Sequence, residues 1–228
     1  MMPLIRSCSL AAVLHLALLS GSSVGQEDAL PRVLLLGDVI YNGPAREAAK
    51  ELKEKVEVVY RQLPPGQPFS TANVLFHIDE FLGDEEWDLI FFNVGLGDLT
   101  YRVPRLKVYR VLSRNAGGVR TASKDEYRSN LARLLKRLKQ TDAQLVWAST
   151  TPIRSSSTQI FEPGSEVAYN QIARELMESE GVAICDMHAK VSDLINLERP
   201  SSFDPFDFEK KPIHPFIVKA LLEHLQLD

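Results

Sequence analysis

The chain has 228 residues and a formal net charge of −4, with 45% hydrophobic and 25% charged residues. This composition is ordinary for a folded globular protein, and the length favours one domain with a full core. A nucleic-acid partner would need a basic face, which the acidic balance gives no reason to expect. The basic run of Arg133, Lys136, Arg137 and Lys139 falls on a predicted helix and is interpreted as its solvated face.

The N-terminal segment has the pattern of a cleavable secretory signal. Met1–Arg6 is a short basic start, and Ser9–Leu19 is apolar but shorter than the about 20 residues that cross a bilayer. Small residues at Ser23 and Gly25 suit a signal peptidase, so we expect residues 1–25 to be removed. The expected product, residues 26–228, is a single secreted or periplasmic domain with no stable membrane insertion. A buried N-terminal helix is the alternative.

The first half of the expected mature chain alternates strand and helix signals. A fully apolar run such as Val33–Leu36 suits a parallel strand that is covered on both faces. In chain order, the pattern predicts a strand over 32–36, a helix over 44–55 with Pro44 in its first turn, a strand over 56–60, a Pro/Gly loop over 63–70, a helix over 71–82 and a strand over 89–94.

The second half continues the alternation after a long loop. The loop, about 100–122, is rich in Tyr, Arg and Gly and suggests an excursion or lid on the active-site side. Ser123 and Glu126 form a capping box that opens a helix with apolar residues up to Leu138. We then expect a strand over 145–149, a helix over 167–178, a strand over 182–186 and a closing helix over 216–227.

The two cysteines bear on stability more than on chemistry. Cys8 would leave with the signal segment, so only Cys185 would remain and no disulfide within the mature chain is possible. Cys185 lies in a predicted buried strand and is interpreted as a small hydrophobic residue, not as a catalytic thiol.

Strands that alternate with helices at these lengths predict the fold class α/β. We expect a three-layer α/β/α sandwich around a mainly parallel five-stranded sheet, of the flavodoxin-like type. In such sheets, function gathers at the carboxyl ends of the strands. Four polar features fall there: Gly37-Asp38-Val39-Ile40, Asn93-Val94-Gly95-Leu96-Gly97-Asp98-Leu99, Ser149-Thr150-Thr151-Pro152, and His214 just before the last helix.

These features in this order resemble the SGNH/GDSL hydrolases, a family of esterases and acylhydrolases. The likeness extends over some 180 residues and nearly all of the expected mature chain. It is carried by Phe92-Asn93-Val94-Gly95-Leu96-Gly97-Asp98-Leu99, by Trp87-Asp88, by Trp147-Ala148-Ser149-Thr150-Thr151-Pro152 and by Tyr169-Asn170-Gln171-Ile172-Ala173. The resemblance implies acyl transfer by a serine, with a histidine as base and an aspartate that orients the ring.

The catalytic positions that the resemblance implies are mostly occupied by unsuitable residues. The serine position is Val39, which has no proton to lose and no lone pair. The histidine matches His214. The orienting aspartate, three residues earlier, falls at Lys211, which has the wrong charge to hold an imidazolium.

The oxyanion hole that the family builds is also incomplete in this sequence. Its asparagine falls at Gly97, which has no side-chain donor, and its second-block glycine falls near Pro68 or Phe69 without a clear match. The loss of a triad serine alone lowers the rate by several orders of magnitude. We therefore expect a catalytically degenerate, exported SGNH-like protein, a pseudoenzyme that keeps a binding cleft over Val39, Gly97 and His214.

Asp38, Gly95, Gly97 and Asp98 are the candidate binding residues of that cleft. Its ligand, by family analogy, is a small molecule or carbohydrate ester, and we expect no cofactor. Asp38 and Asp98 are also interpreted as acceptors of backbone N–H groups. A metal site from Asp38, Asp98 and His214 is an alternative that lacks a ligand-spacing motif.

Two other functions stay open. One is an active esterase or acylhydrolase with a rearranged site around His214, in which Asp204 or Asp207 replaces the acid and Asp38 or Tyr41 acts as nucleophile. The other is a protein-interaction module with a filled cleft. The sequence predicts no oligomeric state.

Overall fold

A computed structural model describes residues 29–228 of the chain, so the expected signal segment lies outside the described residues. Five parallel strands form the central sheet in the order β2-β1-β3-β6-β7. They are β1 (Arg32–Leu36), β2 (Glu57–Arg61), β3 (Leu89–Phe92), β6 (Gln144–Ala148) and β7 (Ala183–Cys185). β2 lies on one side of β1, whereas β3, β6 and β7 follow on the other side. The connections that leave β1 and β3 therefore run to opposite faces of the sheet, and a crevice lies between them.

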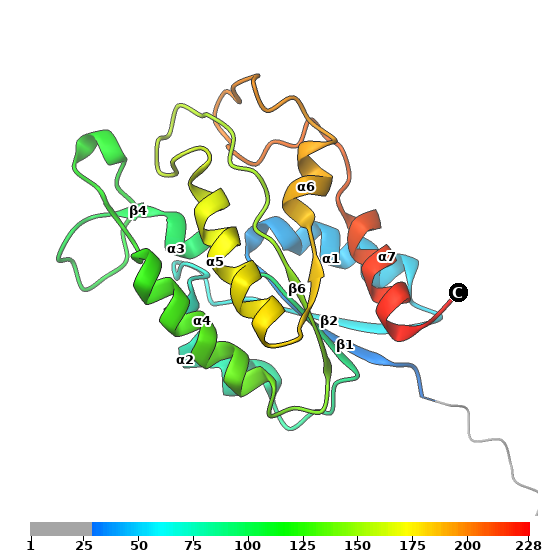
Figure 1. Cartoon of the computed structure of the whole chain (residues 1–228). Helices are drawn as coiled ribbons and strands as arrows, with labels where there is room; N and C mark the ends of the chain where they lie inside the picture. The colour runs from blue at the N-terminus through cyan, green and yellow to red at the C-terminus, as the bar shows by residue number, and fades with distance from the viewer. Residues whose placement is uncertain (1–28) are drawn as a thin grey trace, which may run out of the picture.

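Helices cover both faces of the sheet, as Figure 1 shows. The helices are α1 (Val39–Glu51), α2 (Thr71–Leu82), α3 (Leu96–Leu99), α4 (Lys124–Leu138), α5 (Ser165–Ser179), α6 (Met187–Ser192) and α7 (His214–Leu225). The predicted three-layer α/β/α sandwich is thereby confirmed. Across residues 29–228, none of the helices is both long and apolar enough to span a membrane.

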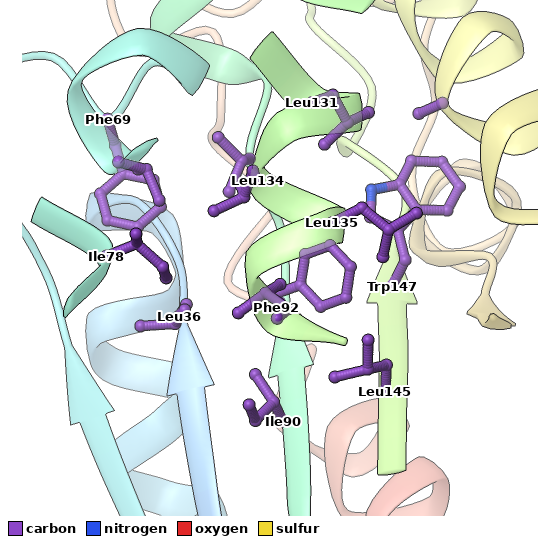
Figure 2. Close-up of a cluster of buried hydrophobic side chains, with 14 of the residues drawn as sticks. Leu36, Phe69, Ile78, Ile90, Phe92, Leu131, Leu134, Leu135, Leu145 and Trp147 are labelled. Atoms are coloured by element: carbon purple, nitrogen blue, oxygen red, sulfur yellow. The ribbon is translucent and has the colours of Figure 1, made fainter. Parts of the chain in front are cut away.

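Two hydrophobic cores lie on opposite faces of the sheet because side chains alternate along each strand. Leu34 and Leu36 point into the core under α2, α4 and α5, whereas Val33 and Leu35 point into the core under α1, α6 and α7. Figure 2 shows the first core, in which Phe92 and Trp147 from neighbouring strands pack against leucines of α4. All of these strand side chains are fully buried, which explains the uninterrupted apolar runs.

The first helix begins one turn earlier than the sequence pattern predicts. The prediction of residues 44–55 took Pro44 as a helix start, but α1 begins at Val39 and ends at Glu51. Asp38 caps this helix, because its Oδ1 accepts a hydrogen bond of 2.9 Å from the N–H of Ile40. Pro44 therefore lies inside α1, where it contributes no N–H to the helix.

The closing helix also begins earlier than predicted. α7 begins at His214 instead of Phe216, with Pro215 in its first turn. His214 is thus the first residue of the helix and not part of the preceding loop. The short helices α3 and α6 were not predicted, because four and six residues are too few for helical periodicity to be visible.

The long segment of residues 100–122 is an ordered excursion. Strand β4 (Tyr101–Arg102) pairs antiparallel with β5 (Val119–Arg120), and a short 3-10 helix (Arg114–Ala116) lies between them. Figure 1 shows the region around β4 extending away from the three layers.

Candidate functional site

The turn after β1 is a rigid strand-to-helix turn that presents Val39. Gly37 is required because an added Cβ would lie 2.8 Å from the Cβ of Tyr41. The hydroxyl of Tyr60 lies 2.7 Å from the carbonyl oxygen of Asp38 and donates a hydrogen bond to it. Packing on one side and a hydrogen bond on the other hold the backbone, so that the position of Val39 is well defined.

The carboxyl group of Asp38 stabilises the turn after β1 by capping α1. The residue is 5% exposed, and burial raises the pKa of its carboxyl to about 7, although the hydrogen bond from Ile40 opposes this shift. The predicted role of Asp38 as a backbone N–H acceptor is confirmed by that hydrogen bond. Its Oδ1 is engaged in capping α1, which makes the carboxylate a poorer nucleophile.

Val39 stands between two cavities. Its side chain is 73% exposed, unusual for a valine, and it lines both a cavity of about 550 Å³ and a second one of about 400 Å³. His214 and Lys211 line the larger cavity, whereas Asp38 and Gly97 line the smaller one. The residue at the serine position is therefore accessible from both sides, as a nucleophile would be, but it carries only methyl groups.

The turn after β3 leaves no room for an oxyanion-hole side chain. An added Cβ at Gly97 would lie 2.4 Å from the carbonyl carbon of Phe69 and 2.5 Å from the nitrogen of Ser70. The main chain of the 63–70 loop thus occupies the space that an asparagine would need. At Gly95, an added Cβ would lie 2.7 Å from Oγ1 of Thr150, so this glycine also permits a close approach.

Asp98 is fully buried and fixes the start of α2. Its Oδ2 accepts the N–H of Thr71 at 2.7 Å, and its Oδ1 lies 2.7 Å from the Thr71 hydroxyl. Burial raises the pKa of the Asp98 carboxyl to about 7, although the hydrogen bonds from Thr71 favour the charged form. Asp98 therefore accepts a backbone N–H, as predicted, but its carboxyl faces α2 and is not among the lining residues of either cavity at Val39.

The His214 ring faces the far end of α1. Its Nε2 lies 3.6 Å from Oε2 of Glu51, the last residue of that helix. Within residues 29–228, the ring makes no hydrogen bond to a Ser or Thr hydroxyl. Glu51 is therefore a carboxylate partner of His214. The sequence does not predict this pair, because the family spacing places the orienting acid at position 211.

Lys211 makes a structural contact. Its ammonium group donates a short hydrogen bond to the carbonyl oxygen of Leu194, just after α6. The residue at the expected acid position thus joins the two ends of the 193–213 loop.

Both aspartates considered as replacement acids cap turns, and Asp204 also lines the larger cavity together with His214. Asp204 accepts the N–H of Phe206 and Asp207 accepts the N–H of Glu209, each at 2.9 Å. Asp38, Asp98 and His214 each face different partners, so they do not converge on a metal site. Over residues 29–228, no group of three or more His, Cys, Asp or Glu side chains is arranged to hold a metal ion.

The polar residues after β3 and β6 form a buried brace, which we define as Asn93, Thr150 and Asn170. Asn93 Nδ2 donates to the carbonyl oxygen of Ala148 at 2.8 Å. Asn170 accepts the N–H of Thr150 and donates to its carbonyl oxygen, both at 2.8 Å. These side chains satisfy backbone groups that strand pairing leaves unpaired, so they support the loops and leave no donor for a ligand.

Cys185 and His188 differ in their surroundings. Cys185 is buried, and burial raises the pKa of its thiol to about 11, which agrees with its interpretation as a small hydrophobic residue. The ring of His188 is 26% exposed, and its Nε2 lies 3.4 Å from the buried carboxylate of Glu166. The sequence does not predict this pair, because the two residues are 22 positions apart.

The smaller cavity has lining groups that sequence analysis did not identify. Its polar side chains include the amides of Asn42, Gln62 and Gln67, and its apolar walls come from prolines of the 63–70 loop together with Phe69, Tyr109 and Phe161. The only charged side chain in the lining is Asp38. Such a mixture of aromatic, proline and amide groups suits a neutral polar ligand.

No protein-family model and no curated protein matches the sequence. Solved structures do match. An acetyl xylan esterase, AlAXEase, has a TM-score of 0.61 at 13% identity, over 83% of this chain and 99% of that one. A lipase/acylhydrolase from Enterococcus faecalis has a TM-score of 0.59 at 14% identity, over 87% and 98%. A GDSL-like lipase from Bacteroides thetaiotaomicron has a TM-score of 0.59 at 14% identity, over 84% and 88%.

These similarities show that the chain has the fold of the SGNH/GDSL hydrolases, as the motifs indicated. At 13–14% identity, they show the fold alone. Another similar structure is a catalytic mutant of an acetylxylan esterase from Geobacillus stearothermophilus in which a serine is replaced by alanine.

Proposed function

We propose that this protein is an exported, catalytically degenerate member of the SGNH/GDSL hydrolases that binds a ligand beside Val39. The single observation that carries the proposal is the exposed valine at the end of a rigid strand-to-helix turn, open to two cavities. The turn has the shape that presents a nucleophile, but the residue presented has no lone pair. The secretory pattern of residues 1–25 supports export.

The remaining catalytic positions support the same conclusion. The ammonium of Lys211 is engaged by a carbonyl oxygen, and the main chain at Phe69 and Ser70 fills the space beside Gly97. Three separate elements of the reaction, the nucleophile, the orienting acid and an oxyanion donor, are therefore missing together. Restoring one of them would leave the other two absent.

The ligand that we propose is a neutral carbohydrate or carbohydrate ester. The smaller cavity offers amide groups from Asn42, Gln62 and Gln67 as hydrogen-bond partners and flat apolar surfaces from Tyr109 and Phe161. Sugars need both, because their hydroxyl groups require partners and their rings have apolar faces. Acetyl xylan esterases are among the proteins with a similar fold, which supports this class of ligand by analogy.

Two measurements test the proposal. Short p-nitrophenyl esters should show no turnover above background with the mature chain. Titration calorimetry with acetylated and deacetylated xylooligosaccharides should show binding that is lost in Val39→Trp, because an indole at this exposed position would obstruct the place where the two cavities meet. Val167→Trp places the same indole at an exposed site on α5 and should leave binding unchanged. Ester turnover that disappears in His214→Ala would contradict the degenerate assignment.

The pairing of His214 with Glu51 is the one observation that favours an active, rearranged hydrolase. A histidine and a carboxylate are two members of a triad, and a hydroxyl nucleophile would complete it. If this function were correct, ester turnover would fall in both His214→Ala and Glu51→Gln. The interaction-module alternative calls for a filled cleft and an exposed apolar patch elsewhere; the two open cavities beside Val39 do not favour it, whereas the exposed Val108 and Val111 do.

A further inference from the structure

The excursion between β3 and α4 is strongly basic in an acidic protein. From Tyr101 to Arg120 it has six basic residues and no acidic residue, whereas the whole chain has a net charge of −4. The six are Arg102, Arg105, Lys107, Arg110, Arg114 and Arg120. The sequence predicts an excursion or a lid here, and the structure places this basic segment outside the three layers.

The base of the excursion is fixed to the body. Arg114 and Arg120 both pair with Glu162, at 2.6 and 2.5 Å. The N–H of Tyr101 donates to the carbonyl oxygen of Ile160 at 2.9 Å, which joins β4 to the same stretch of chain. These two cations share one carboxylate and hold the base of the excursion to the body.

The cations nearer the tip are free. Within residues 29–228, no carboxylate lies within salt-bridge distance of Arg105, Lys107 or Arg110. A hydrogen bond of 2.8 Å from the N–H of Val103 to the carbonyl oxygen of Arg110 closes the loop that carries Arg105 and Lys107. The charge is therefore concentrated on a compact, closed loop.

Apolar side chains alternate with these cations. Pro104-Arg105-Leu106-Lys107-Val108, which we call the tip segment, consists of five consecutive exposed residues. Leu106 is 43% exposed and Val108 is 73% exposed, and Val111 nearby is 45% exposed. Single exposed apolar residues are ordinary, but several together on a projecting basic loop mark an interaction surface.

We propose that the tip segment binds the surface of an anionic phospholipid membrane. Lys and Arg side chains are attracted to anionic headgroups, and apolar side chains between them gain by entering the boundary of headgroups and acyl chains. A dissolved polyanion would satisfy the cations but would offer nothing to Leu106 and Val108. This contact is peripheral and reversible, and it does not depend on the ligand that occupies the cleft.

Lipid-vesicle binding of charge variants tests the electrostatic part. Both cores lie within residues 29–228, so the chain from Gln26 onward is used, which also removes the apolar segment 9–19 from the assay. It should sediment with phosphatidylcholine vesicles that contain phosphatidylglycerol, more weakly at high salt, and not with phosphatidylcholine alone. Each cation at an anionic surface contributes about fivefold, so Arg105→Glu with Lys107→Glu should weaken binding at least about 25-fold.

The matched control changes the same charges elsewhere. Arg133 and Lys136 are exposed on α4 and belong to a solvated helix face. Arg133→Glu with Lys136→Glu alters the net charge by the same amount and should leave vesicle binding within about twofold of the unchanged protein. Equal losses in the two pairs would show a general charge effect and would overturn the proposal.

A fluorescence reporter tests the apolar part. Trp147 is fully buried and Trp87 is 6% exposed, so both should respond little to vesicles. Val108→Trp should shift its emission to the blue when phosphatidylglycerol vesicles are added, whereas Phe76→Trp, at an 83% exposed position on α2, should not. Absence of a shift at position 108, or binding to dissolved polyanions such as DNA or heparin without binding to vesicles, would overturn the proposal.

Discussion

At the carboxyl edge of the sheet, the buried brace and the surroundings of Val39 are built in opposite ways. In the brace, the amides of Asn93 and Asn170 hold the main chain of Thr150 and Ala148 through several hydrogen bonds. Around Val39, two cavities meet at a methyl surface, with His214 in the lining of one cavity and Asp38 in the lining of the other. One region is fully engaged in supporting loops, and the other is open, with a side chain between its cavities that cannot act as a nucleophile.

This comparison teaches that a fold and a reaction can depend on different side chains of the same loops. The loop after β3 carries both Asn93, which supports β6, and Gly97, which stands where the resembled family has an oxyanion donor. The structural residue is present and bonded, whereas the chemical one is replaced by a main-chain contact. Fold similarity by itself therefore says little about activity.

The largest effect should come from forcing a side chain into the turn after β3. Gly97→Asn would place a Cβ 2.4 Å from the main chain of Phe69. Because a backbone cannot move aside as a flexible side chain can, we expect a loss of about 3 kcal/mol or more in unfolding free energy. Urea denaturation measures it. Gly43→Ala is the control, since nothing lies within 4 Å of its added Cβ, and it should stabilise α1 by about 0.5–1 kcal/mol.

Breaking the brace should have the next largest effect. Asn170→Ala would leave the N–H and the carbonyl oxygen of Thr150 without their partners, which costs about 2–3 kcal/mol in unfolding free energy. Thermal and urea unfolding would report it. Gln171→Ala, next along the exposed side of α5, should change stability by no more than about 0.5 kcal/mol. A similar small change for Asn170→Ala would mean that the brace does not support the loops.

The pH dependence of stability should reveal the two buried carboxyl groups. Asp38 and Asp98 each have a folded-state pKa of about 7, whereas the unfolded groups ionise near pH 4. Between these values the folded state binds more protons, so stability should fall as the pH rises from about 4 to about 7.

Asp98→Asn should flatten this profile. Its amide mimics the protonated acid, since the carbonyl oxygen accepts from Thr71 N–H and the NH₂ group donates to the Thr71 hydroxyl. We expect the loss of stability between pH 5 and pH 8 to shrink by on the order of 2 kcal/mol, measured by urea unfolding at each pH. An unchanged profile would contradict a raised pKa at this residue. Asp84→Asn, in an exposed turn, serves as the control.

The smallest effect should follow from restoring the family residues. Val39→Ser combined with Lys211→Asp should change stability by about 1 kcal/mol or less, because both side chains are exposed. We expect no gain of esterase activity, since His214 faces Glu51 and the space beside Gly97 is filled. Measurable hydrolysis of p-nitrophenyl acetate by the double variant would show that the reactive geometry survives and that the cleft is closer to an active site than the contacts indicate.

Most of the sheet could be predicted from the sequence, because its strands are buried on both faces. Val33–Leu36 and Leu89–Phe92 read as unbroken apolar runs for this reason. The start of α1 was harder, since Pro44 is a strong signal for a first turn and Asp38 could be recognised as a cap only by its contact with Ile40. The helix begins at Val39, directly after the capping residue Asp38, and not at Pro44.

The sequence alone determined which chemical groups are available at the ends of the strands. Valine at position 39, lysine at 211 and glycine at 97 are facts of the sequence, and none of these side chains can act as the serine, the aspartate or the asparagine that the resemblance implies there. Apolar runs alternating with helical periodicity likewise determined a parallel α/β sheet, because each run must bury both of its faces.

Only the tertiary structure decided which contacts are made at Gly97, Lys211 and His214. The approach of Phe69 to Gly97, the contact of Lys211 with Leu194 and the orientation of His214 toward Glu51 all join segments that are far apart in the sequence. Such contacts depend on how helices and loops pack against the sheet, and no local pattern encodes them. The tip segment follows the same logic, since within residues 29–228 the fold leaves Arg105 and Lys107 with no carboxylate at salt-bridge distance.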